Sequence, residues 1–493
     1  MELQFKETTV QACQDLARLN KSVQIAMESV VPDTRDDIGR ILSVRPEIYL
    51  KGKELRNKIA SVTGEVVVTV LYINEEETGV SFFSLSQNFR QDCELPSAAD
   101  SDSLQLHFSV TGLQSRVLNP RKISVDLEIS TELTVSRSMK VAVSQELSEA
   151  NTTPIHLRYT EMNAVLMTGV SEKSFSVNEQ LPFPDGEAQP AEIIGKELRY
   201  AIREREIVGN RLLLKGDVLI DMFYCPQESQ LPSSCRFTIP FSQLIDLGDE
   251  NADSADVWIE PTSDYINLVD SMDGQKLLDV ELHALAQARS RRTQELHLIT
   301  DAYSNQMPCE CTCSEQTVCE SLREMPVRLV AEERIELPEE YQDLLAAYPL
   351  LGPCTAEKGS ASMDLLCRAK DGKLFSMRRN IPLRTDGDHK DFSADSFFLS
   401  ECKINQENSQ LNVHIGAESP GLMRRQISLS RVDTLVLDEE NDCDLLSYPS
   451  LTAVWAQTES VWEMAKQYHS SPEAICAMNQ DLSNRPIFIP KAK

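Results

Sequence analysis

Four cysteines that lie close together form the densest group of reactive side chains in the sequence. Cys309, Cys311 and Cys313 alternate with other residues, and Cys319 follows six positions later. If this segment is a strand, the first three thiols share one face, where they could bind zinc or another thiophilic metal or oxidise to cross-links. Zinc sites usually combine two separated Cys-x-x-Cys pairs, a spacing that this cluster lacks. We therefore expect inert thiols and no metal site, with metal binding and cross-linking as the alternatives.

The sequence offers no motif for other kinds of chemistry. The seven histidines lie apart, without a His-x-His pair or a His-Glu-x-x-His motif. The glycine-rich phosphate loop of nucleotide hydrolases and the Gly-x-Ser-x-Gly turn of serine hydrolases are not found either. We expect no enzymatic activity, no catalytic residue and no cofactor.

Charge and composition narrow the choice of partners. The 493 residues include 77 acidic and 48 basic side chains, which gives a net charge of −29. Such a chain repels phosphate backbones and anionic lipid surfaces, so we expect it to bind no nucleic acid. The sequence begins without a signal-peptide pattern and contains no apolar run long enough to span a bilayer. Together with thirteen cysteines, an odd number that are mostly scattered, this favours the reducing cytoplasm.

A long internal repeat covers much of the chain. Several motifs recur at one gapless offset, namely Pro32-Asp33 with Pro184-Asp185, Gly64–Tyr72 with Gly216–Tyr224, and Phe89 with Phe241. This agreement indicates a duplication. A third, more diverged copy follows, in which Gly359–Cys367 aligns with Gly64–Tyr72.

The repeats have the composition of β structure. The stretch Gly64–Tyr72 is rich in β-branched residues and almost continuously apolar, which predicts a strand covered on both faces. Ser124–Leu133 and Leu277–Ala284 alternate as half-buried strands do. We expect small sandwich-like β units with the following limits: 1–171 for the first repeat, 172–324 for the second, 325–440 for the third and 446–493 for a separate terminal domain.

The terminal segment has a different pattern. Ser460 and Glu463 form a capping box before an apolar helical stripe, and Ser471-Pro472-Glu473 is a second helix start. A short strand predicted at Leu451–Trp455 and a proline-bounded strand at Pro486–Pro490 flank the two helices. The predicted fold class is therefore mainly β, with tandem β-rich repeats and a small α+β module of βααβ order.

This module resembles a LysM domain in its first helix, Ser460-Val461-Trp462-Glu463-Met464-Ala465, and in Pro472-Glu473-Ala474-Ile475 and Ile487-Phe488-Ile489-Pro490. LysM domains bind N-acetylglucosamine glycans in a groove between the start of the first helix and the loop before the last strand. The candidate positions for such a groove, or for a protein partner, are Thr458, Glu459, Ser460, Val461, Trp462, Asn479, Asp481 and Leu482. The usual Gly-Asp-Thr is replaced by Thr458-Glu459-Ser460, and the following loop is short, so the resemblance supports the fold more than sugar binding.

The repeats in turn resemble SPOCS domains, through Pro32-Asp33, Asp37-Ile38, Ile41-Leu42 and Gly64–Tyr72. Tandem SPOCS copies that end in one LysM domain are the arrangement of SipL-type sporulation proteins. The resemblance implies a non-enzymatic scaffold of endospore coat assembly, located in the mother-cell cytoplasm at the forespore surface. It also implies that the LysM domain binds the ATPase of the coat basement layer. The alternative is a cell-wall or cortex protein that binds peptidoglycan through LysM.

Overall fold

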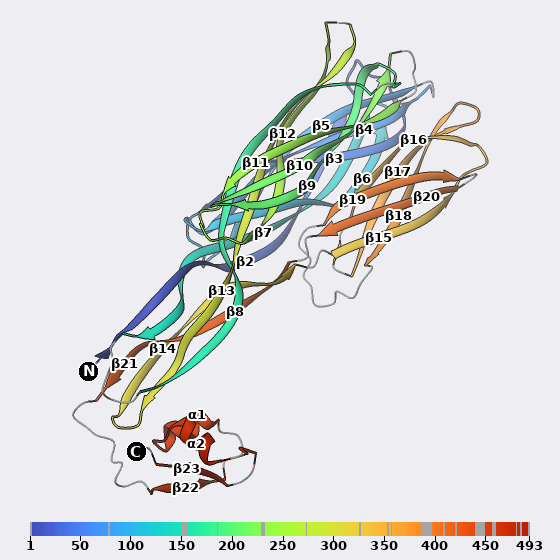
Figure 1. The fold of residues 1–493 in the computed structure, drawn as a ribbon. Coiled ribbons are helices and arrows are strands. Elements are labelled where there is room, and N and C mark those ends of the chain that lie inside the picture. The colour runs from blue at the N-terminus through green and yellow to red at the C-terminus, as the bar shows by residue number, and fades with distance from the viewer. Residues whose placement is uncertain are drawn as a thin grey trace.

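The computed structural model describes residues 2–76, 79–148, 155–184, 186–227, 232–272, 274–324, 327–352, 354–355, 357–385, 397–407, 410–419, 422–438, 449–455, 460–479, 481–483 and 486–491. Three β domains gather at one end, a narrower β stalk extends from them, and a small helical head lies at the far end of the stalk (Figure 1). The prediction of a mainly β protein is confirmed.

The first two domains have the same six-strand order. The first contains β2 (Phe5–Val30), β3 (Ile38–Arg56), β4 (Ile59–Asn74), β5 (Val80–Glu94), β6 (Ser103–Asn119) and β7 (Lys122–Leu147). The second contains β8 (Ile155–Pro182), β9 (Pro190–Val208), β10 (Arg211–Pro226), β11 (Ser233–Asp246), β12 (Ser254–Asp270) and β13 (Lys276–Ser304). In each, three consecutive strands form a small sheet that packs against the two long outer strands and the strand beside them.

The third domain repeats this order with its two long strands divided in two. Its strands are β14 (Cys309–Glu324), β15 (Val327–Glu336), β16 (Tyr341–Leu351), β17 (Lys358–Ala369), β18 (Leu374–Thr385), β19 (Phe398–Glu407), β20 (Gln410–Ser419) and β21 (Leu422–Leu437). The short β1 (Glu2–Leu3) pairs with β21. Because β15 also pairs with β18, the strands β15 to β20 form one six-stranded sheet.

The recurring glycine and phenylalanine of the repeats form a cross-strand pair. Gly64 lies directly opposite Phe89, and Gly216 opposite Phe241. A Cβ atom at either glycine would overlap the phenylalanine ring. The ring thus covers the glycine, which explains why both residues recur at one offset.

The strand β4 is covered on both faces, as its composition predicts. Val66, Val68, Val70 and Tyr72 point into the core of the first domain, whereas Leu71 points the other way. On the face of β4 that points away from this core, Leu71 contacts the equivalent residues of the other two domains, Phe223 and Leu366, in one buried apolar cluster. The three domains therefore pack around a shared core at equivalent positions, which we call the three-domain core.

The stalk consists of the parts of the long strands that run beyond the domains, residues 5–15, 136–147, 155–170, 291–304, 309–324 and 422–437. It forms a nine-stranded sheet together with β1 and the remaining parts of β2, β6, β7, β8, β12 and β13. A register shift occurs in each strand pair where the stalk begins, near Asp15, Ser290 and Ser321. Such bulges bend and twist strands. Here they mark, in each pair of long strands, the boundary between the part in the domain and the part in the stalk. The predicted limit between the first and second repeats, residue 171, lies inside β8. This one strand contributes to both the second domain and the stalk.

Candidate functional site at the stalk end and the C-terminal head

The head is a strand–helix–helix–strand unit with a very small core. It consists of β22 (Leu451–Val454), α1 (Val461–Gln467), α2 (Pro472–Met478) and β23 (Ile487–Pro490), and the two strands pair antiparallel. Each helix begins as its sequence predicts. Ser460 accepts a hydrogen bond from the Glu463 amide at 3.2 Å while the Glu463 carboxylate accepts one from the Ser460 amide, and Ser471 caps α2.

Most of the candidate groove residues are engaged within the head itself. Ser460 is occupied in the capping box, and Val461 and Leu482 pack against the head core. The Asn479 amide nitrogen donates to the Phe488 carbonyl at 2.7 Å, and its oxygen accepts from the Phe488 amide at 2.8 Å. Asp481 accepts from the amide and hydroxyl of Ser483. Thr458 and Glu459 lie outside the described residues.

The remaining candidate, Trp462, is bound to the stalk. Its Nε1 atom donates to the Asp301 Oδ2 atom at 2.7 Å, and Lys466 donates to both carboxylate oxygens of Asp301 at 2.7 and 3.0 Å. Burial alone would raise the pKa of Asp301, but the hydrogen bonds from Lys466 and Trp462 outweigh it and hold the pKa below its ordinary value. Asp301 is therefore ionised near neutral pH, when it attracts Lys466 most strongly.

A second stalk residue completes the head core. Tyr303 is buried among Met464, Ala465 and Ile475 of the head, and its hydroxyl donates to the Ser470 carbonyl at 2.9 Å. The ring meets that of Trp462 edge to face at 5.0 Å and stacks on the His156 ring at 4.9 Å. We call Asp301, Tyr303 and His156 the stalk end: Asp301 and Tyr303 contact the head, and His156 stacks on Tyr303. Figure 1 shows the head at this end of the stalk.

The stalk end could not be identified from the sequence. Asp301 is one of 77 acidic residues, and nothing in the residues around Tyr303 and His156 distinguishes them from other strand residues. Only the pairing of β13 with β8 places Tyr303 opposite His156.

The cysteine cluster lies on β14 beside the head. The Sγ atoms of Cys311 and Cys313 are 3.9 Å apart, next to a register shift between Thr312 and Cys313. Burial raises the pKa of the Cys311 thiol to about 12, so it is protonated at neutral pH and a weak nucleophile. Cys319 is buried elsewhere, beside Cys13. Within the described part of the chain, no three or more His, Cys, Asp or Glu side chains form a group that could hold a metal ion.

Comparison with known proteins finds a similarity in the first two domains. The family described as "SipL, SPOCS domain" matches residues 37–118 and 190–268. These two stretches are similar to SPOCS domains. They extend from β3 to β6 and from β9 into β12, whereas the head lies outside the matched residues. Searches of curated proteins and of solved structures found no match. In the described residues, no helix has the length and apolar character needed to cross a membrane.

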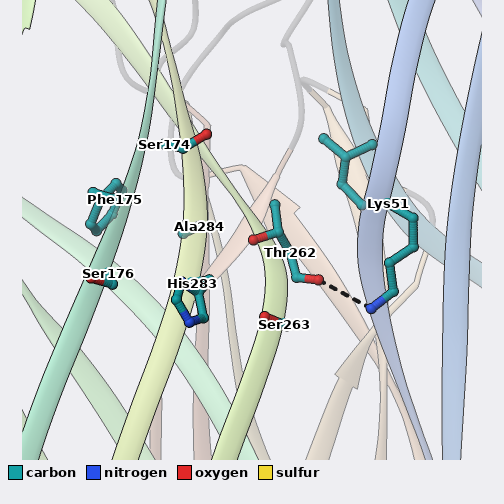
Figure 2. Close-up of a pocket in the computed structure, with 9 residues that line it drawn as sticks. Lys51, Ser174, Phe175, Ser176, Thr262, Ser263, His283 and Ala284 are labelled. Carbon is teal, nitrogen blue, oxygen red and sulfur yellow. Dashed lines mark hydrogen bonds between the residues drawn. The ribbon is translucent and has the colours of Figure 1, made fainter.

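An open groove of about 560 Å³ lies between the two SPOCS-like domains (Figure 2). Hydroxyl groups of Ser174, Ser176, Thr262 and Ser263 line it, from strands β8 and β12. Lys51 reaches across from β3 and donates to the Thr262 carbonyl at 3.3 Å. The Lys51 ammonium also pairs with Glu65 at 3.0 Å, so this cation is already neutralised within the protein. The groove is a polar seam between the domains.

A half-buried acidic group in the same interface, Glu47, is expected to make stability depend on pH. Burial raises the pKa of Glu47 from 4.5 to about 7, despite the nearby Lys196 and Arg45, and Asp264 adds to the rise. Asp264 itself accepts from the Tyr49 hydroxyl at 2.7 Å and pairs with Lys196 at 2.5 Å. A raised carboxyl pKa favours the protonated folded form, so the stability contribution of Glu47 is present below about pH 4.5 and lost as the pH rises through about 7.

Glu47→Gln mimics the protonated acid. At pH 8 its free energy of unfolding is therefore expected to be about 2 kcal/mol higher than that of the unsubstituted protein. The two should be equal near pH 4.5. Urea unfolding at a series of pH values measures the difference, and Glu54→Gln, at an exposed position on the same strand, is the control. A difference that does not change with pH would contradict the assignment.

Proposed function

We propose that this protein is a non-enzymatic scaffold of endospore coat assembly, which tethers the coat basement layer to the forespore surface through its head. The observation that carries the proposal is the joining, in one chain, of two SPOCS-like domains to a terminal βααβ head. The SPOCS match supports a sporulation-related role, and the resemblance of the head to LysM domains suggests that it binds the partner. That partner would be the ATPase of the basement layer, in the mother cell.

The form of the head favours a protein partner over a glycan. Asn479 and Asp481, which would have to face a sugar, use their side chains to hold the head together. A peptidoglycan ligand, the alternative, would have to replace these contacts with its own hydrogen bonds.

Deletion of Tyr448–Lys493 tests the proposal. We expect a fluorescent fusion of the truncated chain to disperse from the forespore surface in sporulating cells, because the partner-binding module is lost. Circular dichroism of the purified truncated protein should retain the β signal, since the three domain cores lie outside the deletion. Retained localisation at the forespore would count against docking through the head.

A sedimentation assay on insoluble peptidoglycan distinguishes the alternative. Sedimentation of the full chain with the wall material, abolished by the same deletion, would favour a cell-wall or cortex protein. We expect the full chain to stay in the supernatant.

A further inference from the structure

The contact between the head and the stalk end has the character of a specific binding interface. Trp462 and Lys466 lie one helical turn apart on α1 and therefore on the same face of the helix. Both side chains converge on one carboxylate, that of Asp301. The Tyr303 ring, which is only 2% exposed, enters the head core beside them. A charged hydrogen-bonding group and a buried aromatic ring in one patch are typical of the residues that dominate interfaces.

The head is covalently attached beside this surface. β21 ends at Leu437 and β22 begins at Leu451, so the intervening chain can span at most about 45 Å. Because the head and the stalk end belong to one chain, their contact is intramolecular, which favours rebinding after each release. The attachment therefore permits a closed state and an open state of one chain.

We propose that the stalk end is an acceptor surface for α1, and that docking there conceals α1 from the protein partner of the head. This inference rests on the proposed function, in which the head is the partner-binding module. In the closed state the Trp462 and Lys466 side chains are taken by the chain itself. A partner that uses this face of α1 binds only the open fraction, so its apparent dissociation constant is raised by the docking equilibrium.

The test uses the full chain with Asp301→Asn, which keeps the side-chain shape but removes the charge that Lys466 and Trp462 share. Glu161→Gln is the matched control, because it removes one stalk carboxylate that pairs with His297 and not with the head. Fluorine NMR of protein labelled with 5-fluorotryptophan reports on docking directly, since the chain has only three tryptophans, Trp258, Trp455 and Trp462. Substitution of each by phenylalanine assigns the three signals.

We expect Asp301→Asn to shift and narrow the Trp462 signal, and Glu161→Gln to leave it unchanged. The purified ATPase of the coat basement layer should bind the Asp301→Asn protein about tenfold more tightly than the control, because the loss of charge-assisted hydrogen bonds raises the open fraction. An unmoved Trp462 signal would overturn the docked state. A moved signal with equal or weaker binding would overturn the concealment.

Failure of the proposed function gives a different result. If neither the Asp301→Asn protein nor the control binds the ATPase, the partner assignment fails and concealment fails with it. The Trp462 signal still decides whether the head docks on the stalk end.

Discussion

Replacing Arg289 by methionine is expected to lower the free energy of unfolding by about 3–5 kcal/mol. The Arg289 side chain is only 2% exposed and lies on β13 where the stalk begins. Its guanidinium donates to the Asp15 carboxylate at 2.9 Å and to the Ser136 hydroxyl at 2.6 Å, on strands β2 and β7. Methionine fills a similar volume but removes the cation that pairs with the Asp15 carboxylate, and the loss of one partner from a largely buried ion pair is costly.

The same arginine connects parts of the protein that are distant in sequence. Arg289 lies on a long strand of the second domain, whereas Asp15 and Ser136 lie on the long strands of the first, and Asp15 also accepts from the Cys319 thiol on β14, which continues into the third. The substitution is therefore expected to destabilise the place where the long strands of all three domains enter the stalk, and not only one strand.

Urea unfolding followed by circular dichroism measures the loss. Arg158→Met, at an exposed position on the stalk strand β8, is the matched control and should change stability by less than about 0.5 kcal/mol. Addition of Asp15→Asn to Arg289→Met should recover part of the loss, because the carboxylate that has lost its cation is then removed as well. Equal stability of Arg289→Met and Arg158→Met would show that the buried pair contributes nothing.

The sequence contains much of the local structure of this protein. The near-continuous apolar stretch Gly64–Tyr72 predicts a strand covered on both faces, and the structure confirms it. Ser460 and Ser471 predict two helix starts, and both serines cap helices. These features are predictable because they depend on neighbouring residues, through strand composition and the free amides of the first helical turn.

The stalk and the stalk end could not be predicted in this way. The sequence of β8 gives no sign that its first half leaves the second domain, because both halves are equally strand-like. Asp301 is recognised as an acceptor only when β13 brings it to α1, more than 150 residues further along the chain. Contacts of this kind depend on the register and packing of distant strands, which short-range patterns do not contain.

The three-domain core allows packing between domains to be tested separately from packing within a domain. Met222 and Tyr224, which flank Phe223 on β10, point into the core of the second domain. Phe223 points outward, is 2% exposed and meets Tyr348 of the third domain edge to face at 5.4 Å. Phe223→Ala is therefore expected to lower the opening free energy of the third domain by about 3 kcal/mol, from the lost ring burial and the cavity that it leaves.

Hydrogen exchange measured by mass spectrometry locates this effect, because domains that lose a stabilising contact open more often as units. In Phe223→Ala, exchange should accelerate most in β16, β17 and β18 of the third domain. The control is Ile220→Ala on the same strand, whose side chain is buried in the core of the second domain, so its acceleration should fall on β9, β10 and β11. If both variants accelerated exchange in the same strands, Phe223 would act within its own domain, and the equivalent positions of Leu71 and Leu366 would have no role in holding the three domains together.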